Sequence, residues 1–284
     1  MLKNVIILGL KVVVLAFLLF VCFLVASVAV GLSDSAQTVD STSTMMVLTM
    51  CALDTIVLSY PIIRSRWTGW RLVVTIFFVF YGVMTFLSQI ETVVFLQYLV
   101  EIVPAEMIPK LFMQGAITAA LFSPLAILIH GRMRRCKEPW KPSRRLIMPW
   151  KEWTWKLALI AVIYVVVYVS FGSFVFMQLA GEAAQEYYAN LQLPEWILLF
   201  QAVRAMIWTA LALPVIRMMK GRWWEAGLAV ALLFSVLMSA NLLIPNPFMP
   251  ETIRMAHFVE VSSSNFLFGW IVVWLLHIHQ RVPA

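Results

Sequence analysis

Five ionisable side chains interrupt the long apolar runs of this sequence, and they are its first candidates for chemistry. They are Asp54, Glu91, Arg204, His257 and Glu260. An ionisable side chain inside a bilayer is costly, so such residues mark binding sites, ion pathways or proton relays by default. A buried carboxyl group near a histidine is suited to carrying protons. An arginine is suited to holding an anionic group of a bound molecule.

Uncharged polar residues accompany these five. Gln201 lies one helical turn before Arg204, and Ser264 shares a helix face with His257 and Glu260. The candidate substrate or proton site therefore comprises Asp54, Glu91, Gln201, Arg204, His257, Glu260 and Ser264. Nearly all of these positions fall in one half of the bilayer, the extracytoplasmic half in the orientation derived below. We expect a polar cavity there.

Each candidate has a specific chemical interpretation and a structural alternative. Asp54 and Arg204 lie at similar depths, roughly 14 Å into their helices at about 1.5 Å per residue, so an ion pair between them is expected. His257 and Glu260 have the spacing of two metal ligands on a helix face, but two ligands do not make a site. No metal and no cofactor is therefore predicted. Structurally, the Asp54–Arg204 pair would only lock two helices, Glu91 would be solvated at the interface, and the serines would serve helix packing.

The composition is that of a membrane protein. Hydrophobic residues make up 62% of the 284 residues and charged residues 12%, whereas about a quarter of a soluble domain is charged. An apolar run of about 20 residues crosses a hydrocarbon core about 30 Å thick. Eight such runs predict an all-α polytopic membrane protein with about eight transmembrane helices, at residues 5–31, 45–63, 72–90, 111–130, 157–179, 196–216, 226–244 and 255–277.

The third run leaves two alternatives open. It could continue beyond Glu91 to residue 100 as one long helix, or it could break near Glu91. The sequence does not decide between them.

Lysine and arginine placement predicts the orientation. Cytoplasmic loops carry an excess of these residues. If the N-terminus is cytoplasmic, the outer loops hold only Lys110 and Arg254, and the other loop cations lie inside. We therefore expect both termini in the cytoplasm. A prokaryotic plasma membrane is the expected location, because the sequence has neither a targeting extension nor an Asn-x-Ser/Thr acceptor site.

The two halves of the sequence resemble each other. The segments 59–64 and 212–217 both place a proline three residues before an arginine, and each is followed by a loop rich in arginine and tryptophan. The pattern predicts two tandem four-helix units, residues 1–135 and 157–284, joined by a linker at 136–156. An even helix number makes them a parallel repeat about an axis along the membrane normal. The alternative is chance similarity, since these residue types are common at membrane interfaces.

The composition of the linker predicts which molecules the protein contacts. Its cations are interleaved with tryptophan, which suits anionic lipid headgroups at about 1 kcal/mol per cation. A nucleic-acid partner is not expected, because the positive-inside rule already accounts for the net charge of +7. The expected partners are thus the lipid bilayer, anionic headgroups and a small-molecule or ion cargo, with any protein partner left open.

Three functions remain open. The sequence has no Gly-rich phosphate loop followed by lysine, no His-Glu-x-x-His motif and no Gly-x-Ser-x-Gly motif. A small secondary transporter with a proton-coupled site is favoured over an enzyme. The alternatives are an intramembrane enzyme acting on a lipid or lipid-linked substrate, with His257 and Glu260 as its acid–base pair, and a non-catalytic membrane subunit or scaffold.

Overall fold

The structure, a computed structural model, describes residues 2–32, 41–99, 104–134, 145–189, 191 and 193–278. Within these ranges the regular secondary structure is helical, apart from one isolated β-bridge. Eight helices in the described ranges are long and apolar enough to cross a membrane. The all-α class and the number of long apolar helices are therefore confirmed for this part of the chain.

The helices correspond to the predicted apolar runs and extend beyond the ends of most of them. The first four runs correspond to α1 (Leu2–Ala29), α2 (Ser41–Arg64), α3 (Trp70–Tyr81) with π-helix η1 (Gly82–Phe86) and α4 (Leu87–Leu99), and α5 (Met107–Ile129). The last four correspond to α6 (Trp150–Phe171) with π-helix η2 (Gly172–Phe176) and α7 (Met177–Tyr187), α8 (Ile197–Met218), α9 (Trp223–Ser239) with 3₁₀-helix η3 (Ala240–Leu243), and α10 (Glu251–His277).

The structure decides one boundary that the sequence left open, and it moves another. The third run continues as one long helix to Leu99, so it does not break near Glu91. Helix α6 begins at Trp150, inside the stretch expected to be linker. The first part of that linker, residues 136–144, and its predicted contacts with lipid headgroups lie outside the described residues.

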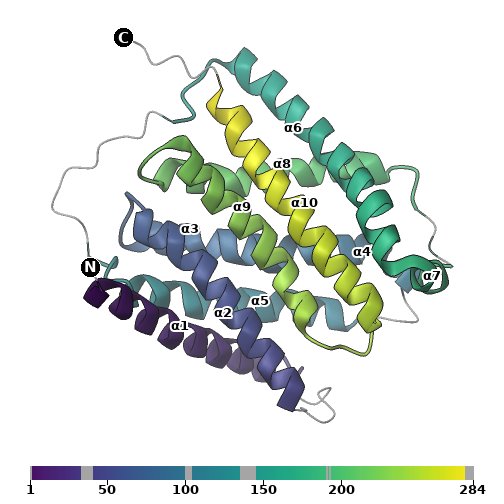
Figure 1. The fold of residues 1–284 in the computed structure, drawn as a ribbon, viewed down its shortest axis with the longest axis horizontal. Coiled ribbons are helices and arrows are strands. Elements are labelled where there is room, and N and C mark those ends of the chain that lie inside the picture. The colour runs from purple at the N-terminus through teal and green to yellow at the C-terminus, as the bar shows by residue number, and fades with distance from the viewer. Residues whose placement is uncertain are drawn as a thin grey trace.

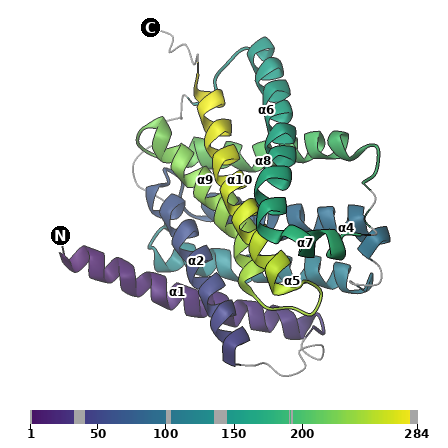
Figure 2. The same ribbon diagram turned by 45° about the vertical axis from the view of Figure 1, so that its right-hand side comes forward.

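Helices α1 and α6 lie at opposite edges of the molecule in both views (Figures 1 and 2). Both carry large apolar side chains on their outer surfaces, such as Val13 and Phe17 on α1 and Val162 and Val166 on α6. A soluble monomer rarely exposes such continuous apolar surface. These edges fit contact with lipid.

The inner helices build the core, and their contacts join the two halves of the chain. In the first half α1 packs on α2 and α5, and α3 packs on α5. In the second half α6 packs on α8 and α10, and α9 packs on α10. Between the halves α2 packs on α9, and α3 packs on α8. The two halves of the chain therefore share one continuous core.

Helices α9 and α10 approach each other closely at Gly269. A Cβ atom at this position would lie 2.9 Å from the Cα atom of Ala231 and 3.1 Å from the carbonyl oxygen of Val230. Small residues allow such close backbone approach between membrane helices. The glycine therefore sets the spacing of the helix that carries His257 and Glu260.

The loops that follow α2 and α8 meet at one end of the bundle. They pair as an antiparallel β-bridge between Ser65 and Met219. Each loop donates one backbone hydrogen bond to the other, at 2.6 and 2.9 Å. These bonds tie the first half of the chain to the second.

Arginine side chains complete this end. Arg132 donates to the carbonyl of Ser65. Arg145 donates to one carbonyl in the last turn of α8, at 3.2 Å, and to two carbonyls in the loop that follows, at 3.0 and 2.6 Å. Arg64 pairs with Glu225 across the two halves. The carbonyls at a helix C-terminus have no partner within the helix, so cations there are favourable. We use the name basic end for these loops, which comprise residues 65–69, 131–134, 145–149 and 219–222.

Candidate functional site

An ion pair between α4 and α8 forms the first part of the site. The Nη2 atom of Arg204, a side chain only 3% exposed, lies 2.7 Å from Oε2 of Glu91, which is 26% exposed. Arg204 also donates to Oε1 of Gln201 at 3.2 Å and to the backbone carbonyl of Leu87 at 3.0 Å. Gln201 donates to Oε1 of Glu91 at 3.4 Å. The three side chains thus form a closed network that joins the two halves of the chain.

The ion pair expected between Asp54 and Arg204 is not formed. Asp54 is fully buried, and neither of its carboxyl oxygens has a hydrogen-bond partner. The reason lies in the helix packing. Helix α8 packs on α3 and η1, which lead into Glu91, whereas α2 packs mainly on α1, α9 and η3. Glu91 therefore takes the place that the sequence suggested for Asp54.

A hydrogen-bonded chain of three side chains forms the second part of the site. The Oη atom of Tyr188 lies 2.8 Å from Nε2 of His257, and Nδ1 of His257 lies 3.2 Å from Oε2 of Glu260. The ring of Phe176 stacks on the imidazole with centroids 4.1 Å apart. Because the imidazole can bind a proton on either nitrogen, this chain can pass a proton between a phenol and a carboxyl group.

Two tyrosines connect the two parts electrostatically. Tyr168 and Tyr188 each interact with both Glu91 and Glu260. We therefore group the ion pair and the hydrogen-bonded chain as one candidate site. We use the name polar cluster for Glu91, Tyr168, Tyr188, Gln201, Arg204, His257 and Glu260. It lies toward the end of the bundle opposite the basic end.

Two π-helical turns lead into the polar cluster. In η1 the N–H of Leu87 bonds to the carbonyl of Gly82, and in η2 the N–H of Met177 bonds to the carbonyl of Gly172. Such turns are rare and often occur at functional sites. An extra residue in a turn rotates the helix that follows it. Here η1 sets the rotation of the α4 residues, and η2 itself contributes Phe176.

A sharp kink at Gly181 positions Tyr188. Gly181 has φ of 52° and ψ of −130° within α7, a conformation that residues with a side chain rarely adopt. Beyond the kink, Ala184 packs with Ala256 of α10. The end of α7 therefore covers the imidazole of His257 with the ring of Tyr188.

Replacing Gly181 with alanine is expected to loosen this cover. An added Cβ would meet nothing within 4 Å, so the cost is backbone strain of about 1–3 kcal/mol rather than a clash. Hydrogen exchange of residues 182–188 should become faster in the variant. The matched control is Gly172→Ala, because Gly172 has an ordinary helical φ of −59° and equally open surroundings. Equal exchange in the two variants would contradict the prediction.

Two remaining predictions concern Ser264 and metal ligands. The hydroxyl of Ser264 donates to the carbonyl of Val261 in its own helix at 3.3 Å, so the structure does not bring it into the network of His257 and Glu260. Among the described residues, no group of three His, Cys, Asp or Glu side chains could hold a metal ion.

Sequence reasoning missed four contributors to the site: the side chains of Tyr168, Phe176 and Tyr188 and the backbone carbonyl of Leu87. These three side chains were not distinguished from the many aromatic residues of the apolar runs, and the carbonyl of Leu87 has no signature in sequence. The glycines at the two π-helical turns, each preceded by an aromatic residue, were the available signal. Glycine within a helical run is costly and often has a packing or functional reason.

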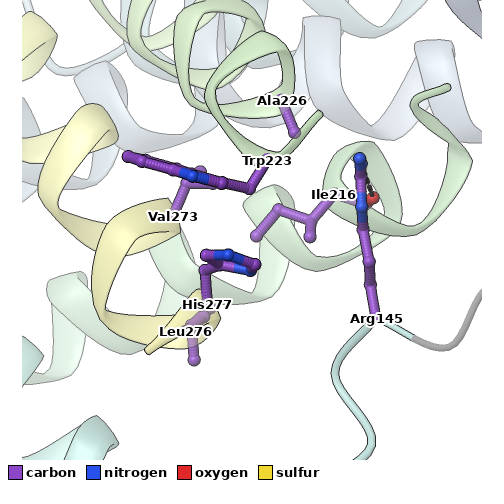
Figure 3. Close-up of a pocket in the computed structure, with 7 residues that line it drawn as sticks. All are labelled: Arg145, Ile216, Trp223, Ala226, Val273, Leu276 and His277. Carbon is purple, nitrogen blue, oxygen red and sulfur yellow. Dashed lines mark hydrogen bonds between the residues drawn. The ribbon is translucent and has the colours of Figure 1, made fainter. Parts of the chain in front are cut away.

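A small cavity lies at the basic end (Figure 3). Its volume is about 10 Å³, and its lining includes Arg145, Trp223 and His277. The rings of Trp223 and His277 stack with centroids 5.3 Å apart. A cavity of this size holds about one water molecule. It is remote from the polar cluster and does not enlarge the candidate site.

Comparisons of the chain with protein-family models, with curated proteins and with solved structures gave no match. The class of protein is therefore described from its fold and its site alone. The described chain is an all-helical protein with eight helices long and apolar enough to span a membrane, and these helices hold a polar cluster in which Gln201 and Arg204 are buried and the other side chains are partly exposed. This arrangement fits a multi-pass integral membrane protein.

Proposed function

We propose that this chain is a small secondary carrier, built from two parallel four-helix units, with both termini on the cytoplasmic side of a prokaryotic plasma membrane. Its cargo is a small molecule or ion, and its transport is coupled to protons at the polar cluster. The linker between the units lies against anionic lipid headgroups.

The neighbour pattern supports the repeat. The packing of α1 on α2 and α5 recurs as that of α6 on α8 and α10, and the packing of α3 on α5 recurs as that of α9 on α10. An antiparallel bridge between the loops after the second helix of each unit is compatible with a twofold axis along the membrane normal. Parallel repeats of this kind occur in known transporter folds.

The gathering of basic loops supports the orientation. The loops of the basic end are joined by backbone and arginine hydrogen bonds, so their cations lie on one side of the proposed membrane. Cytoplasmic loops carry such an excess.

The ion pair between the buried Arg204 and the partly exposed Glu91 is the observation that carries the proposal. It lies between the two units, where transporters place their sites. Protonation of Glu91 would neutralise the carboxylate and leave the guanidinium able to bind an anionic group of the cargo. The chain from Tyr188 through His257 to Glu260 lies beside this pair and supplies groups that exchange protons. A purely structural pair would not need such a neighbour.

Side-specific thiol labelling tests the carrier proposal. A cysteine replaces Ser264, which is 7% exposed beside the polar cluster on α10, in a protein whose Cys22, Cys51 and Cys136 are replaced. A membrane-impermeant maleimide is then applied to sealed right-side-out and inside-out vesicles. Alternating access predicts labelling from both sides. The matched control is Ser263→Cys, on the exposed face of the same helix, which lipid should protect from both sides.

Two results would overturn the carrier proposal. Labelling of the Ser264→Cys protein from one side alone would indicate a fixed, one-sided cavity. No labelling from either side, with the folded protein verified by size-exclusion chromatography, would indicate that the polar cluster only holds helices together.

The hydrogen-bonded chain also favours a second candidate, an intramembrane enzyme acting on a lipid or lipid-linked substrate. His257 and Glu260 would act as the acid–base pair and Arg204 would hold an anionic group. The imidazole is 24% exposed, so a substrate could reach it from the bilayer. One-sided labelling at position 264 would favour this candidate over the carrier.

A further inference from the structure

Asp54 lies in the middle of α2, apart from the polar cluster. At about 1.5 Å per residue it is about 20 Å from Ser41 and about 15 Å from Arg64, the ends of its helix. Its side chain is fully buried, and both carboxyl oxygens lack a hydrogen-bond partner. The hydroxyl of the next residue, Thr55, is also fully buried and also lacks a partner. Two adjacent polar groups are thus unsatisfied in the core.

Among the described residues, no side chain forms a hydrogen bond with the carboxyl group of Asp54. Helix α2 packs on α1, α3, α9 and η3. The ionisable side chains on these elements are Lys3, Lys11 and Cys22 in α1, Cys51, Tyr60 and Arg64 in α2, Arg71 and Tyr81 in α3, and Glu225 in α9. Cys51, one turn before Asp54, interacts with it electrostatically. Arg64 pairs with Glu225 at the basic end instead.

These surroundings accept a neutral carboxyl group and not a carboxylate. An ionised carboxylate without water or a donor costs far more than a buried hydroxyl. A bound metal cation would need several oxygen ligands, whereas the unpaired oxygens known here are those of Asp54 and Thr55. A proton needs one carboxyl oxygen only.

We propose that Asp54 is a proton-binding site in the interior of the first four-helix unit, separate from the polar cluster. The carboxylate binds one proton and becomes the neutral acid, and no other bond changes. In the conformation described here the proton is bound. The proton leaves when α2 and α9 separate and admit water. This release, unlike the binding itself, rests on the proposed carrier function.

Infrared spectroscopy of the reconstituted full-length protein tests the proton site without knowledge of the cargo. The chain has only three aspartates, Asp34, Asp40 and Asp54, so labelling with side-chain ¹³C-aspartate isolates a few bands. Near neutral pH the wild-type protein should show one isotope-shifted carboxylic-acid C=O band. The band should be lost in Asp54→Asn and retained in an Asp34→Asn/Asp40→Asn variant.

The outcomes separate this proposal from the carrier proposal. The measurement on labelled wild-type protein stands even if Asp54→Asn does not fold. An aspartate signal that consists only of carboxylate bands near neutral pH would overturn the proton site, as would an ionised band that shifts on addition of sodium ions. A carboxylic-acid band together with one-sided labelling at position 264 would preserve the proton site and reject the carrier.

Discussion

Replacement of Arg204 by methionine should destabilise the protein by about 2 kcal/mol, because it leaves the partly buried carboxylate of Glu91 without its cation. Glu91 would lose its cation, and the carbonyl of Leu87 would lose its donor. The unfolding free energy can be measured in detergent by tryptophan fluorescence. The matched control is Arg217→Met on the exposed face of the same helix, where a loss below about 0.5 kcal/mol is expected.

A double-mutant cycle identifies the cause of this loss. If the unpaired charge dominates, Glu91→Gln combined with Arg204→Met should cost less than the sum of the single changes, since neither partner then remains charged. Additive losses would show that Arg204 acts through packing. Equal losses for Arg204→Met and Arg217→Met would contradict the ion pair altogether.

Gly269→Val is expected to be the most damaging apolar substitution in α10. Even its Cβ atom would lie 2.9 Å from a backbone atom of α9, and backbone cannot move aside as a flexible side chain can. Overpacking of this kind costs about 1–3 kcal/mol or more. Since α10 carries His257 and Glu260, its displacement should also disturb the polar cluster. The fraction of monodisperse protein that survives heating measures the effect.

The control for this substitution is Gly9→Val on α1. A Cβ atom there would meet nothing within 4 Å, so the same residue change is made on a lipid-facing surface. Loss of monodisperse protein in both variants would mean that valine, and not the close helix contact, is responsible.

The sequence predicts the long apolar helices, but not how the polar side chains on them pair. Apolar runs show which segments can span a membrane, because spanning requires sufficient length and hydrophobicity. Pairing depends on the rotation of each helix about its axis. Asp54 and Glu91 are both carboxylates within reach of Arg204 in depth, and the helix packing around α8 alone selects Glu91.

Local departures from the α-helix explain the other omissions. The π-helical turn at Gly82 alters the rotation of the helix that carries Glu91, and the kink at Gly181 redirects the chain toward His257. Neither changes the hydrophobic pattern enough to be read from composition or periodicity. Tyr188 therefore became visible as part of the site only with the folded chain.

The bridge between Ser65 and Met219 has a mechanical consequence. Two reciprocal backbone hydrogen bonds hold the two halves together at the basic end. If these bonds stay intact, any rotation of one half relative to the other must pivot there. A tilt of about 10° would move atoms at the far side of a core about 30 Å thick by roughly 5 Å, close to one helical turn. In such a rotation the displacement would be greatest at the end of the bundle opposite the bridge, beside Glu91 and Arg204.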